Sequence, residues 1–249
     1  MSMRFHRMGL LAGPDGMTAL SNARVALFGL GGVGSWTAEC LVRSGVTDIL
    51  LVDADTVAES NINRQLVALG STTGRPKAEV LRERLLDINP DANITVRVER
   101  YTSDTADSFD LASFTHVIDA IDSLADKALL ILRATSISGL RFYSSMGAAM
   151  RLDPSHIKVD EFRKVKGCRL AAALRSRFKR MDMMPRRKFK CVFSDEQPIA
   201  RQADAPEDTS GAMTYGKVAV NGAACHITAI FGMTLASLVI NDIIGRRKN

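Results

Sequence analysis

A glycine-rich turn is the first feature of this chain that could do chemistry. Gly29, Gly31 and Gly34 follow the spacing G-x-G-x-x-G, with Gly32 as a fourth glycine, between a short apolar strand and a helix. Such glycines allow a tight turn and bring the backbone close to a phosphate, which the helix N–H groups can bind. Asp53 closes the next predicted strand, where a carboxylate typically holds ribose hydroxyls. The pattern predicts a nucleotide site, and a nicotinamide-dependent oxidoreductase would fit it as well.

Two cations follow this turn, Arg64 in a polar loop and Lys77 at the start of a predicted helix. Hydride transfer needs no such pair beyond the pyrophosphate site. Adenylyl transfer does, because negative charge moves onto the departing pyrophosphate and fixed cations stabilise it. Alone, each cation could be a surface ion pair, but together they favour ATP chemistry. The other polar residues expected to line the nucleotide pocket are Asp55, Asn61, Asn63 and Gln65.

An acidic pair closes the fourth predicted strand. Ligands of open α/β sheets lie beyond the carboxyl ends of the strands, and Asp122 stands there. A carboxylate at this point could hold a Mg²⁺ ion that bridges ATP phosphates, because hard cations take oxygen ligands. Asp119 is expected to be a turn acceptor, and Lys127 a solvated helix charge.

The charge of the chain is unevenly distributed. Residues 163–190 contain twelve Lys or Arg and one Asp, a net charge of +11, whereas the whole chain carries +6 and the remainder therefore −5. A basic face on an acidic body favours a polyanionic partner such as tRNA, although a solvated face without a partner is the alternative. The methionines of this stretch, Met181, Met183 and Met184, are expected to be packing or loop contacts. The candidate nucleic-acid-binding residues are Arg175, Arg177, Lys179, Arg180, Arg186, Arg187, Lys188 and Lys190.

The elements that must position these residues alternate between strand and helix. Strands are expected at 24–28, 46–52, 94–98, 116–121 and 141–146, and helices at 36–43, 76–88 and 126–138. This alternation predicts an α/β fold, a Rossmann-like, doubly wound and mostly parallel sheet.

The pattern changes after Gly147, which suggests an ATP-binding core at 1–147 and a C-terminal α+β extension at 148–249, integrated into one domain. The extension is expected to hold strands at 157–162 and 190–194 and a basic amphipathic helix at 168–181. A polar loop should follow at 196–216. The apolar segment 218–244 is interrupted by polar residues and is interpreted as a buried core helix, not a membrane span.

Cysteine usage and the N-terminus indicate a cytoplasmic protein. No secretory signal is apparent, and no C-x-x-C pair of the structural zinc type occurs. Reduced thiols are therefore expected, with Cys168 and Cys191 in the core. The four cysteines are Cys40, Cys168, Cys191 and Cys225.

Taken together, the motifs of the first half resemble the signature of the ubiquitin-activating-enzyme superfamily, which includes bacterial molybdopterin and thiamine pathway adenylyltransferases. The resemblance implies ATP with Mg²⁺, adenylation of a carboxylate, and a homodimer in which an N-terminal arginine, here Arg7, reaches the partner's site. The motifs that carry it are the turn at 29–35, Asp53-x-Asp55-x-Val57, Ser60-Asn-x-Asn-Arg-Gln65, Lys77 and Asp119-Ala-Ile-Asp122-Ser.

The second half resembles one branch of that superfamily, the tRNA threonylcarbamoyladenosine dehydratases. The resemblance implies adenylation of the threonyl carboxylate on a modified adenosine of tRNA, followed by attack of the carbamoyl nitrogen and closure of a cyclic hydantoin. Some members carry a cysteine near the position of Lys217, so no cysteine is given a catalytic role here. The motifs are Asp153-Pro154, Cys168-x-Leu-Ala171, Cys191-Val-Phe-Ser194-x-Glu196 and Phe231-Gly232.

Three other functions stay open at this point. An adenylyltransferase for a ubiquitin-like sulfur-carrier protein would leave the basic stretch unexplained. A nicotinamide-dependent oxidoreductase would leave the paired cations unexplained. A non-catalytic tRNA-binding scaffold would keep ATP binding without a product, and some relatives associate with cysteine desulfurase systems, although no residue singled out here shows such a contact.

Overall fold

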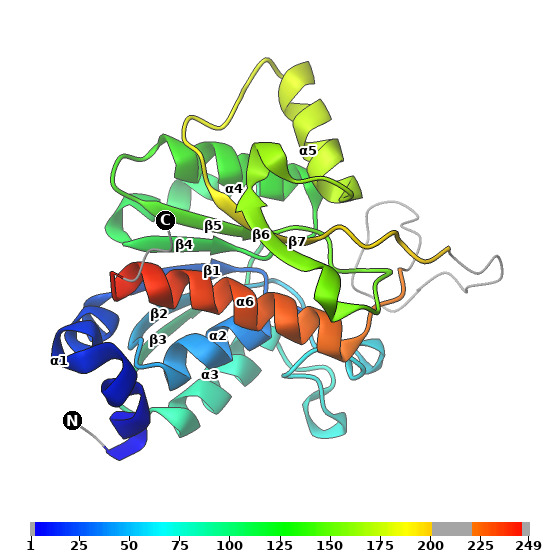
Figure 1. Ribbon diagram of the computed structural model, residues 1–249. Coiled ribbons are helices and arrows are strands. Elements are labelled where there is room, and N and C mark those ends of the chain that lie inside the picture. The colour runs from blue at the N-terminus through cyan, green and yellow to red at the C-terminus, as the bar shows by residue number, and fades with distance from the viewer. Residues whose placement is uncertain (1–2, 201–220, 246–249) are drawn as a thin grey trace.

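The computed structural model describes residues 3–200 and 221–245 and contains one seven-stranded sheet of order β3-β2-β1-β4-β5-β7-β6 (Figure 1). All neighbouring strands are parallel except β6, which runs antiparallel to β7. The predicted α/β, mostly parallel sheet is therefore confirmed. The strands are β1 (Arg24–Phe28), β2 (Asp48–Val52), β3 (Asn93–Arg97), β4 (His116–Asp119), β5 (Arg141–Ser145), β6 (Ile157–Glu161) and β7 (Lys190–Ser194).

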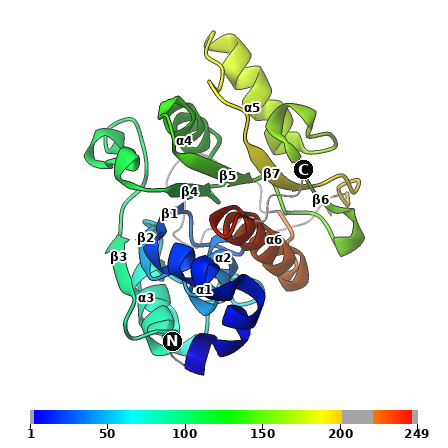
Figure 2. The ribbon, with the colours of Figure 1, turned by 60° about the vertical axis from the view of Figure 1, so that its left-hand side comes forward.

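Helices cover both faces of the sheet, as Figure 2 shows. One face carries α1, α2, α3 and α6, and the other carries α4 and α5. The helices are α1 (His6–Asn22), α2 (Gly34–Arg43), α3 (Lys77–Ile88), α4 (Leu124–Ser136), α5 (Arg169–Arg180) and α6 (Cys225–Ile243). Short 3₁₀ helices lie at Met3–Phe5, Glu59–Asn61, Gly70–Thr72, Ala106–Ser108, Leu111–Ser113, Pro154–His156 and Phe162–Lys164.

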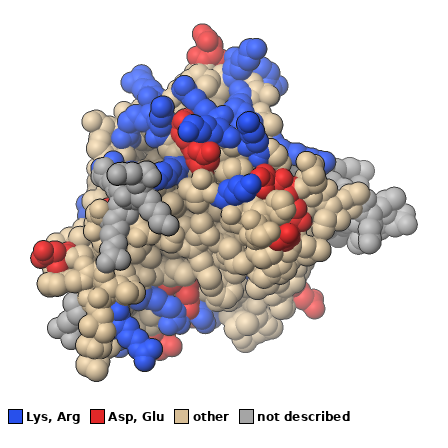
Figure 3. All heavy atoms as spheres, viewed as in Figure 1, with Lys and Arg blue, Asp and Glu red and all other residues tan. Residues whose placement is uncertain are grey.

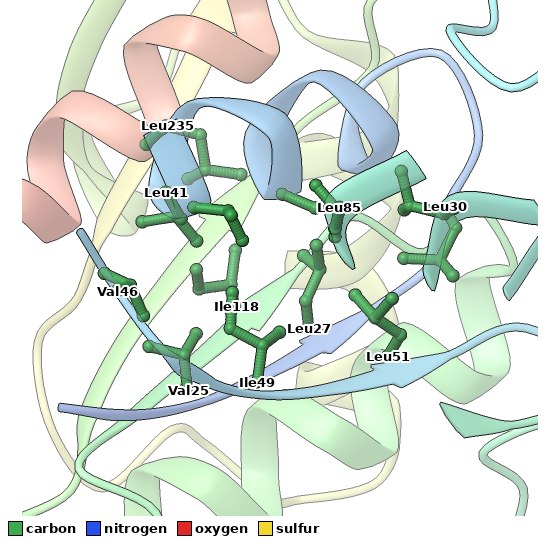
Figure 4. Packing of buried hydrophobic residues seen from close by; sticks show 14 of the residues in the cluster. Val25, Leu27, Leu30, Leu41, Val46, Ile49, Leu51, Leu85, Ile118 and Leu235 are labelled. Carbon is green, nitrogen blue, oxygen red and sulfur yellow. The ribbon is translucent and has the colours of Figure 1, made fainter. Parts of the chain in front are cut away.

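The core is built by alternation along the buried strands. Val25 and Leu27 of β1 face the helices α2 and α6, whereas Ala26 and Phe28 face the α4 side. Figure 4 shows Val25 and Leu27 packed among leucines and isoleucines of neighbouring strands and helices. Since both faces of the central strands are covered, these strands are apolar throughout, as is usual for a parallel sheet.

The strand order reverses between β1 and β4, which lie side by side in the sheet while their crossover connections lead in opposite directions. Ligands of such sheets bind in the crevice at the carboxyl ends of the strands that flank this switch point. The glycine turn follows β1, and Asp122 follows β4. The fold therefore brings these two predicted ligand-binding segments to the same edge of the sheet.

Helix α6 packs closely on the rest of the molecule. Among the described helices it alone is long and apolar enough to cross a membrane, but it packs on α2, β5 and β7. A Cβ atom on Gly232 would lie 2.5 Å from the carbonyl oxygen of Val33. The interpretation of this segment as a core helix is borne out from Cys225 on, whereas the described residues 221–224 are not helical. Of the expected helix 218–244, residues 218–220 lie outside the described residues, as do residues 201–216 of the expected polar loop.

The sequence interpretation missed helix α1, and it shifted several strand ends by one or two residues. α1 contains Gly13 with φ 71° and then Pro14, so it is broken by a kink, and its glycines weaken any helical pattern. Strand β4 ends at Asp119, not at residue 121. The Asp119 carboxylate accepts the backbone N–H of Ile121 at 3.0 Å, and this bond turns the chain out of the sheet.

Candidate nucleotide site and basic surface

The glycine turn has a shape that only glycine permits at two positions. Gly29 has φ +85°, and a Cβ there would lie 2.6 Å from the carbonyl oxygen of Ala120 on the β4 side. A Cβ on Gly34 would lie 1.8 Å from the carbonyl oxygen of Gly29. The first glycine thus lets the β1 and β4 turns touch, and the last lets α2 start directly against the turn. Binding of a phosphate by this backbone stays a prediction.

The two central glycines face other parts of the chain. A Cβ on Gly31 would lie 3.7 Å from Nε2 of Gln65, an ordinary contact, whereas one on Gly32 would press on Thr228 of α6 at 3.0 Å. Ser35 binds the turn from the other side, because its hydroxyl donates to the Gly31 carbonyl at 2.7 Å. The turn is therefore supported by α6, a segment nearly 200 residues away in the chain. Neither Thr228 nor Ser35 was singled out from the sequence.

Asp53 connects the glycine turn to the loop after β2. One carboxylate oxygen accepts the N–H of Leu30 at 2.6 Å, and the other accepts the N–H of Asp55 at 2.8 Å. Burial raises the pKa of Asp53, and the nearby charge of Lys77 opposes that rise. The side chain thus holds the turn in place, and its role as a ribose ligand stays a prediction.

Lys77 lies in the first turn of α3 with only 5% of its surface exposed. Its ammonium contacts Asp55 at 2.8 Å, and the side chain of Asp55 is 41% exposed. Lys77 is therefore not one half of a surface ion pair, because its charge is buried beside a partly solvated carboxylate. The ammonium of Lys77 contacts the carboxylate of Asp55. A buried charge is stabilised by further oppositely charged partners, so this ammonium can also bind a phosphate of a nucleotide.

Arg64 and Asn63 form a second polar group at the same edge. The Arg64 guanidinium donates to the carbonyl of Ser60 and to the side chain of Asn63, both at 2.9 Å. The Asn63 amide in turn donates to the carbonyl of Ala223 at 2.8 Å. Arg64 is half-buried and is therefore held by the protein in one orientation. These bonds link the loop after β2 to the chain just before α6.

Asn61 and Gln65 are buried in that loop. The Asn61 side chain accepts the N–H of Ala58 at 3.2 Å and so stabilises the loop itself. Gln65 is 7% exposed, and its Oε1 is buried without a hydrogen-bond partner among the described residues. A buried acceptor with no partner is costly, so a donor from a bound molecule would restore the lost bond.

A fully buried ion pair lies below Asp122. Lys127 and Asp119 are both 0% exposed, and their side chains meet at 2.8 Å. Lys127 also donates to the carbonyl of Ile121 at 2.9 Å, and the hydroxyl of Ser144 donates to Asp119 at 2.7 Å. Burial raises the pKa of Asp119, against the opposing effect of Lys127. The turn that carries the exposed Asp122 is thus fixed from beneath.

The expectation that Lys127 is a solvated helix charge is wrong. Lys127 lies on the same helical face as Leu130, Ile131 and Ala134, which are all buried. A lysine in an apolar stripe of this spacing is the signal that could have revealed its burial. The prediction of Asp119 as a turn acceptor is confirmed by its bond from Ile121, and the ion pair adds a second role.

Arg7 lies far from these groups within one subunit. It is exposed on α1, which ends two residues before β1 begins, whereas the glycine turn follows the end of β1. Figure 1 shows α1 at the edge of the sheet opposite to the loop after β2. The resemblance implies that this arginine reaches the nucleotide site of a second copy of the chain, and that role stays a prediction.

The predicted nucleic-acid-binding residues differ in how far they are exposed to solvent. Figure 3 shows the basic side chains gathered over α5, at the top of the molecule. Two of them are used by the fold itself: Arg175 donates to the Val165 carbonyl at 3.0 Å, and Arg187 donates to the Ala134 and Thr135 carbonyls at the end of α4. Arg177 is half-buried. The exposed members are Lys179, Arg180, Arg186, Lys188 and Lys190.

The four thiols differ in burial: Cys225 is exposed, Cys40 is half-buried, and the other two lie in the core. Cys168 and Cys191 are buried, as expected, and burial raises the pKa of the Cys191 thiol well above its ordinary value. Among the residues that the structure describes, no group of three or more His, Cys, Asp or Glu could hold a metal ion. The role of Asp122 as a metal ligand stays a prediction.

Comparison with known proteins shows the family to which this chain belongs. A model of the ThiF family matches residues 5–248. The tRNA threonylcarbamoyladenosine dehydratase of Bacillus subtilis (strain 168) is 33% identical over 244 residues, which covers 97% of this chain and 94% of the relative. The crystal structure of the E. coli tRNA N6-threonylcarbamoyladenosine dehydratase, TcdA, in complex with AMP has a TM-score of 0.85 and 33% identity, and covers 98% of this chain and 94% of that chain. The same enzyme in complex with ATP has a TM-score of 0.83, 32% identity and the same coverage. This chain belongs to the ThiF family.

Proposed function

We propose that this protein catalyses the ATP-dependent dehydration of threonylcarbamoyladenosine in tRNA to its cyclic hydantoin form, in the cytoplasm, through a carboxyl adenylate. The observation that carries the proposal is the likeness, over nearly the full length of both chains, to dehydratases of that name. The polar groups gathered at the carboxyl edge of the sheet support it, because adenylation needs fixed cations at a phosphate site.

The residues at this edge fit ATP. The glycine turn leaves backbone N–H groups near the start of α2, Lys77 presents a buried ammonium, and the Oε1 atom of Gln65 lacks a partner among the described residues. An exposed carboxylate at Asp122 fits Mg²⁺, which usually binds one or two carboxylates together with substrate phosphates. Mg²⁺ held there would neutralise charge on the phosphates of ATP.

In the first step, an oxygen of the threonyl carboxylate attacks the α-phosphorus of ATP. The bond from that phosphorus to the bridging oxygen breaks, and pyrophosphate leaves with the electron pair. Lys77 and Arg64 stabilise the negative charge that develops on the leaving group, and both are held in place before the reaction begins. The product is a mixed anhydride between the carboxylate and AMP.

In the second step, the carbamoyl nitrogen of the same nucleoside attacks the activated acyl carbon. The C–N bond closes the hydantoin ring, AMP leaves with the electrons of the broken C–O bond, and the nitrogen loses its proton to solvent. The nucleophile belongs to the substrate, so the ring closure is intramolecular and gains from a high effective concentration. No thiol of the protein takes part in this step, neither the buried Cys168 and Cys191 nor the exposed Cys225.

The proposal includes tRNA and a second copy of this chain. The exposed cations over α5 would hold the phosphate backbone of tRNA, with a marked dependence on salt concentration. Arg7 of one subunit would complete the nucleotide site of the other, as the resemblance implies. A cysteine desulfurase partner remains an implication of the resemblance alone.

The test is a direct assay of product. The protein is incubated with ATP, Mg²⁺ and tRNA that carries the threonylcarbamoyl group, and the digested nucleosides are analysed by mass spectrometry. We expect a loss of one water from the modified nucleoside, only with ATP, together with AMP and pyrophosphate. ATP–pyrophosphate exchange that depends on a sulfur-carrier protein and not on tRNA would contradict the proposal and favour the adenylyltransferase alternative.

A further inference from the structure

The turn at the end of α5, residues 181–184, exposes three large apolar side chains in the middle of the basic surface. Met181 is 42% exposed and Met183 and Met184 are each 48% exposed. Of the expectation that they are packing or loop contacts, the loop position is borne out, and roughly half of each side chain faces solvent. We call residues 181–184 the methionine turn. Its position just after the cations of α5 needs an explanation that packing does not supply.

The backbone gives the methionine turn a defined shape. Asp182 has φ 50°, a left-handed conformation that is uncommon outside glycine. The N–H of Met183 donates to the carbonyl of Phe178 at 3.1 Å, and that of Asp182 donates to the carbonyl of Lys179 at 3.3 Å. These two bonds close the end of α5 in the Schellman arrangement, usually formed with glycine. The turn thus holds its methionines at the surface in a fixed arrangement.

A hollow lies beside the methionine turn. It has a volume of about 380 Å³ and is lined by Arg175, Phe178, Lys179, Asp182 and Met184. Phe178 is fully buried, and the Arg175 guanidinium is bound to backbone carbonyls, so these two shape the hollow. Lys179, Asp182 and Met184 are its exposed members. A ligand there would meet an apolar thioether and an ammonium, and also the carboxylate of Asp182 at the rim of the hollow.

This combination fits unpaired RNA better than other polyanions. Sequence-independent contact with a double helix needs only cations on the phosphates. RNA loops also expose bases, and proteins that bind them pair a cationic groove with apolar or stacking side chains for the base faces. The surrounding cations make an apolar protein partner a poor match, because binding would desolvate their charges.

We propose that the methionine turn contacts unpaired bases of an RNA loop at the hollow, while Lys179, Arg180 and Arg186 hold the flanking phosphates. The inference rests on the proposed function, because it takes tRNA as the partner, and it adds that a single-stranded loop is the part recognised here. The methionines contribute a preference for loops, and the cations contribute affinity for any RNA.

Two RNA probes separate these contributions. Binding of the full-length protein is measured with an unmodified anticodon stem–loop and with a blunt duplex of the same stem sequence, across a range of salt concentrations. In the triple variant Met181→Ser/Met183→Ser/Met184→Ser, we expect about tenfold weaker binding of the stem–loop, duplex binding unchanged within about twofold, and an unchanged salt slope. Val98→Ser, an exposed apolar residue beyond β3, is the matched control and should change neither.

The outcomes distinguish this inference from the proposed function. If the native protein binds the stem–loop and the triple variant binds it equally well, the methionine turn has no role and the inference fails alone. Equal loss for both RNAs with a changed salt slope would also overturn it, because the effect would then lie in the phosphate contacts. If the native protein binds neither RNA, the assignment of tRNA as substrate fails as well. Met184→Ser alone, with thermal unfolding as a check of folding, repeats the test if the triple variant is unstable.

Discussion

The candidate nucleotide site and the basic surface over α5 both contain charged side chains, but these differ in burial and pairing. At the nucleotide end, Lys77 and Lys127 are buried and each contacts a carboxylate at 2.8 Å. Over α5, Lys179, Arg180 and Arg186 are exposed to solvent. Buried, paired charges hold atoms in fixed positions at a cost in desolvation, whereas exposed charges attract a polyanion over a distance and are screened by salt.

This difference predicts which residues act on chemistry and which on affinity. Substitutions at the nucleotide end should change stability or the reaction and leave RNA binding alone. Substitutions on the basic surface should change RNA binding and its salt dependence. Arg187 breaks this division, because it belongs to the basic stretch yet binds the end of α4.

The largest expected effect is at the buried ion pair. Replacing Lys127→Met leaves Asp119 buried without its partner, and we expect the free energy of unfolding to fall by about 3–5 kcal/mol in urea denaturation. Because burial raises the pKa of Asp119, the deficit should shrink as the pH falls and this carboxylate is protonated. The double variant Asp119→Asn/Lys127→Met removes both charges and should recover most of the loss. A single variant as stable as the native protein would show that the pair has no organising role.

The next effect concerns the reaction itself. Lys77→Ala and Asp122→Ala should each lower the rate of hydantoin formation by about 10²–10³-fold, since each removes charge stabilisation at the phosphates. Binding of tRNA should be unchanged in both variants, as measured by filter binding. Asp104→Ala, an exposed acid in the loop between β3 and β4, is the control. A native rate in Asp122→Ala would remove this residue from the metal site.

A smaller effect separates two adjacent arginines. Arg186→Glu places a negative charge on the exposed surface, and we expect about tenfold weaker tRNA binding with a salt slope lower by about 1. Arg187→Ala should instead lower the free energy of unfolding by about 1–3 kcal/mol, because two backbone carbonyls of α4 lose a charged donor. If the two variants behaved alike, the division between exposed and structural cations would be wrong.

The smallest effect is a pH dependence on the nucleotide side. Glu39 is buried in α2, which alone would raise its pKa, but hydrogen bonds from Arg84 and Arg43 outweigh burial and lower it. A lowered pKa stabilises the folded state at neutral pH, and this stabilisation is lost as the pH falls below about 4.5 and Glu39 is protonated. Glu39→Gln should therefore be about 1–2 kcal/mol less stable at pH 7, with the difference vanishing in acid. A difference that is constant with pH would contradict the assignment.

Local spacing was enough to predict the order of the elements and the motifs they carry. A strand, a glycine turn and a helix are specified by neighbouring residues, and the turn at Gly29 and Gly34 has the close contacts that its pattern requires. The same reasoning missed α1, because Gly13 and Pro14 interrupt its periodicity. It also read Lys127 as solvated, because the side chain was judged by its charge and not by the apolar face it shares.

The sequence by itself determined the parallel α/β sheet, the glycine turn at its switch point and the strong positive charge of residues 163–190. Only the tertiary structure decided which charges are buried, that Thr228 of α6 supports Gly32, and that the methionine turn faces solvent. The physical reason is that spacing along the chain sets local geometry, whereas burial and pairing depend on segments that approach each other only after folding. Lys127 and Arg186 are both cations in the sequence, and their surroundings make one a fixed support and the other an exposed charge for a polyanion.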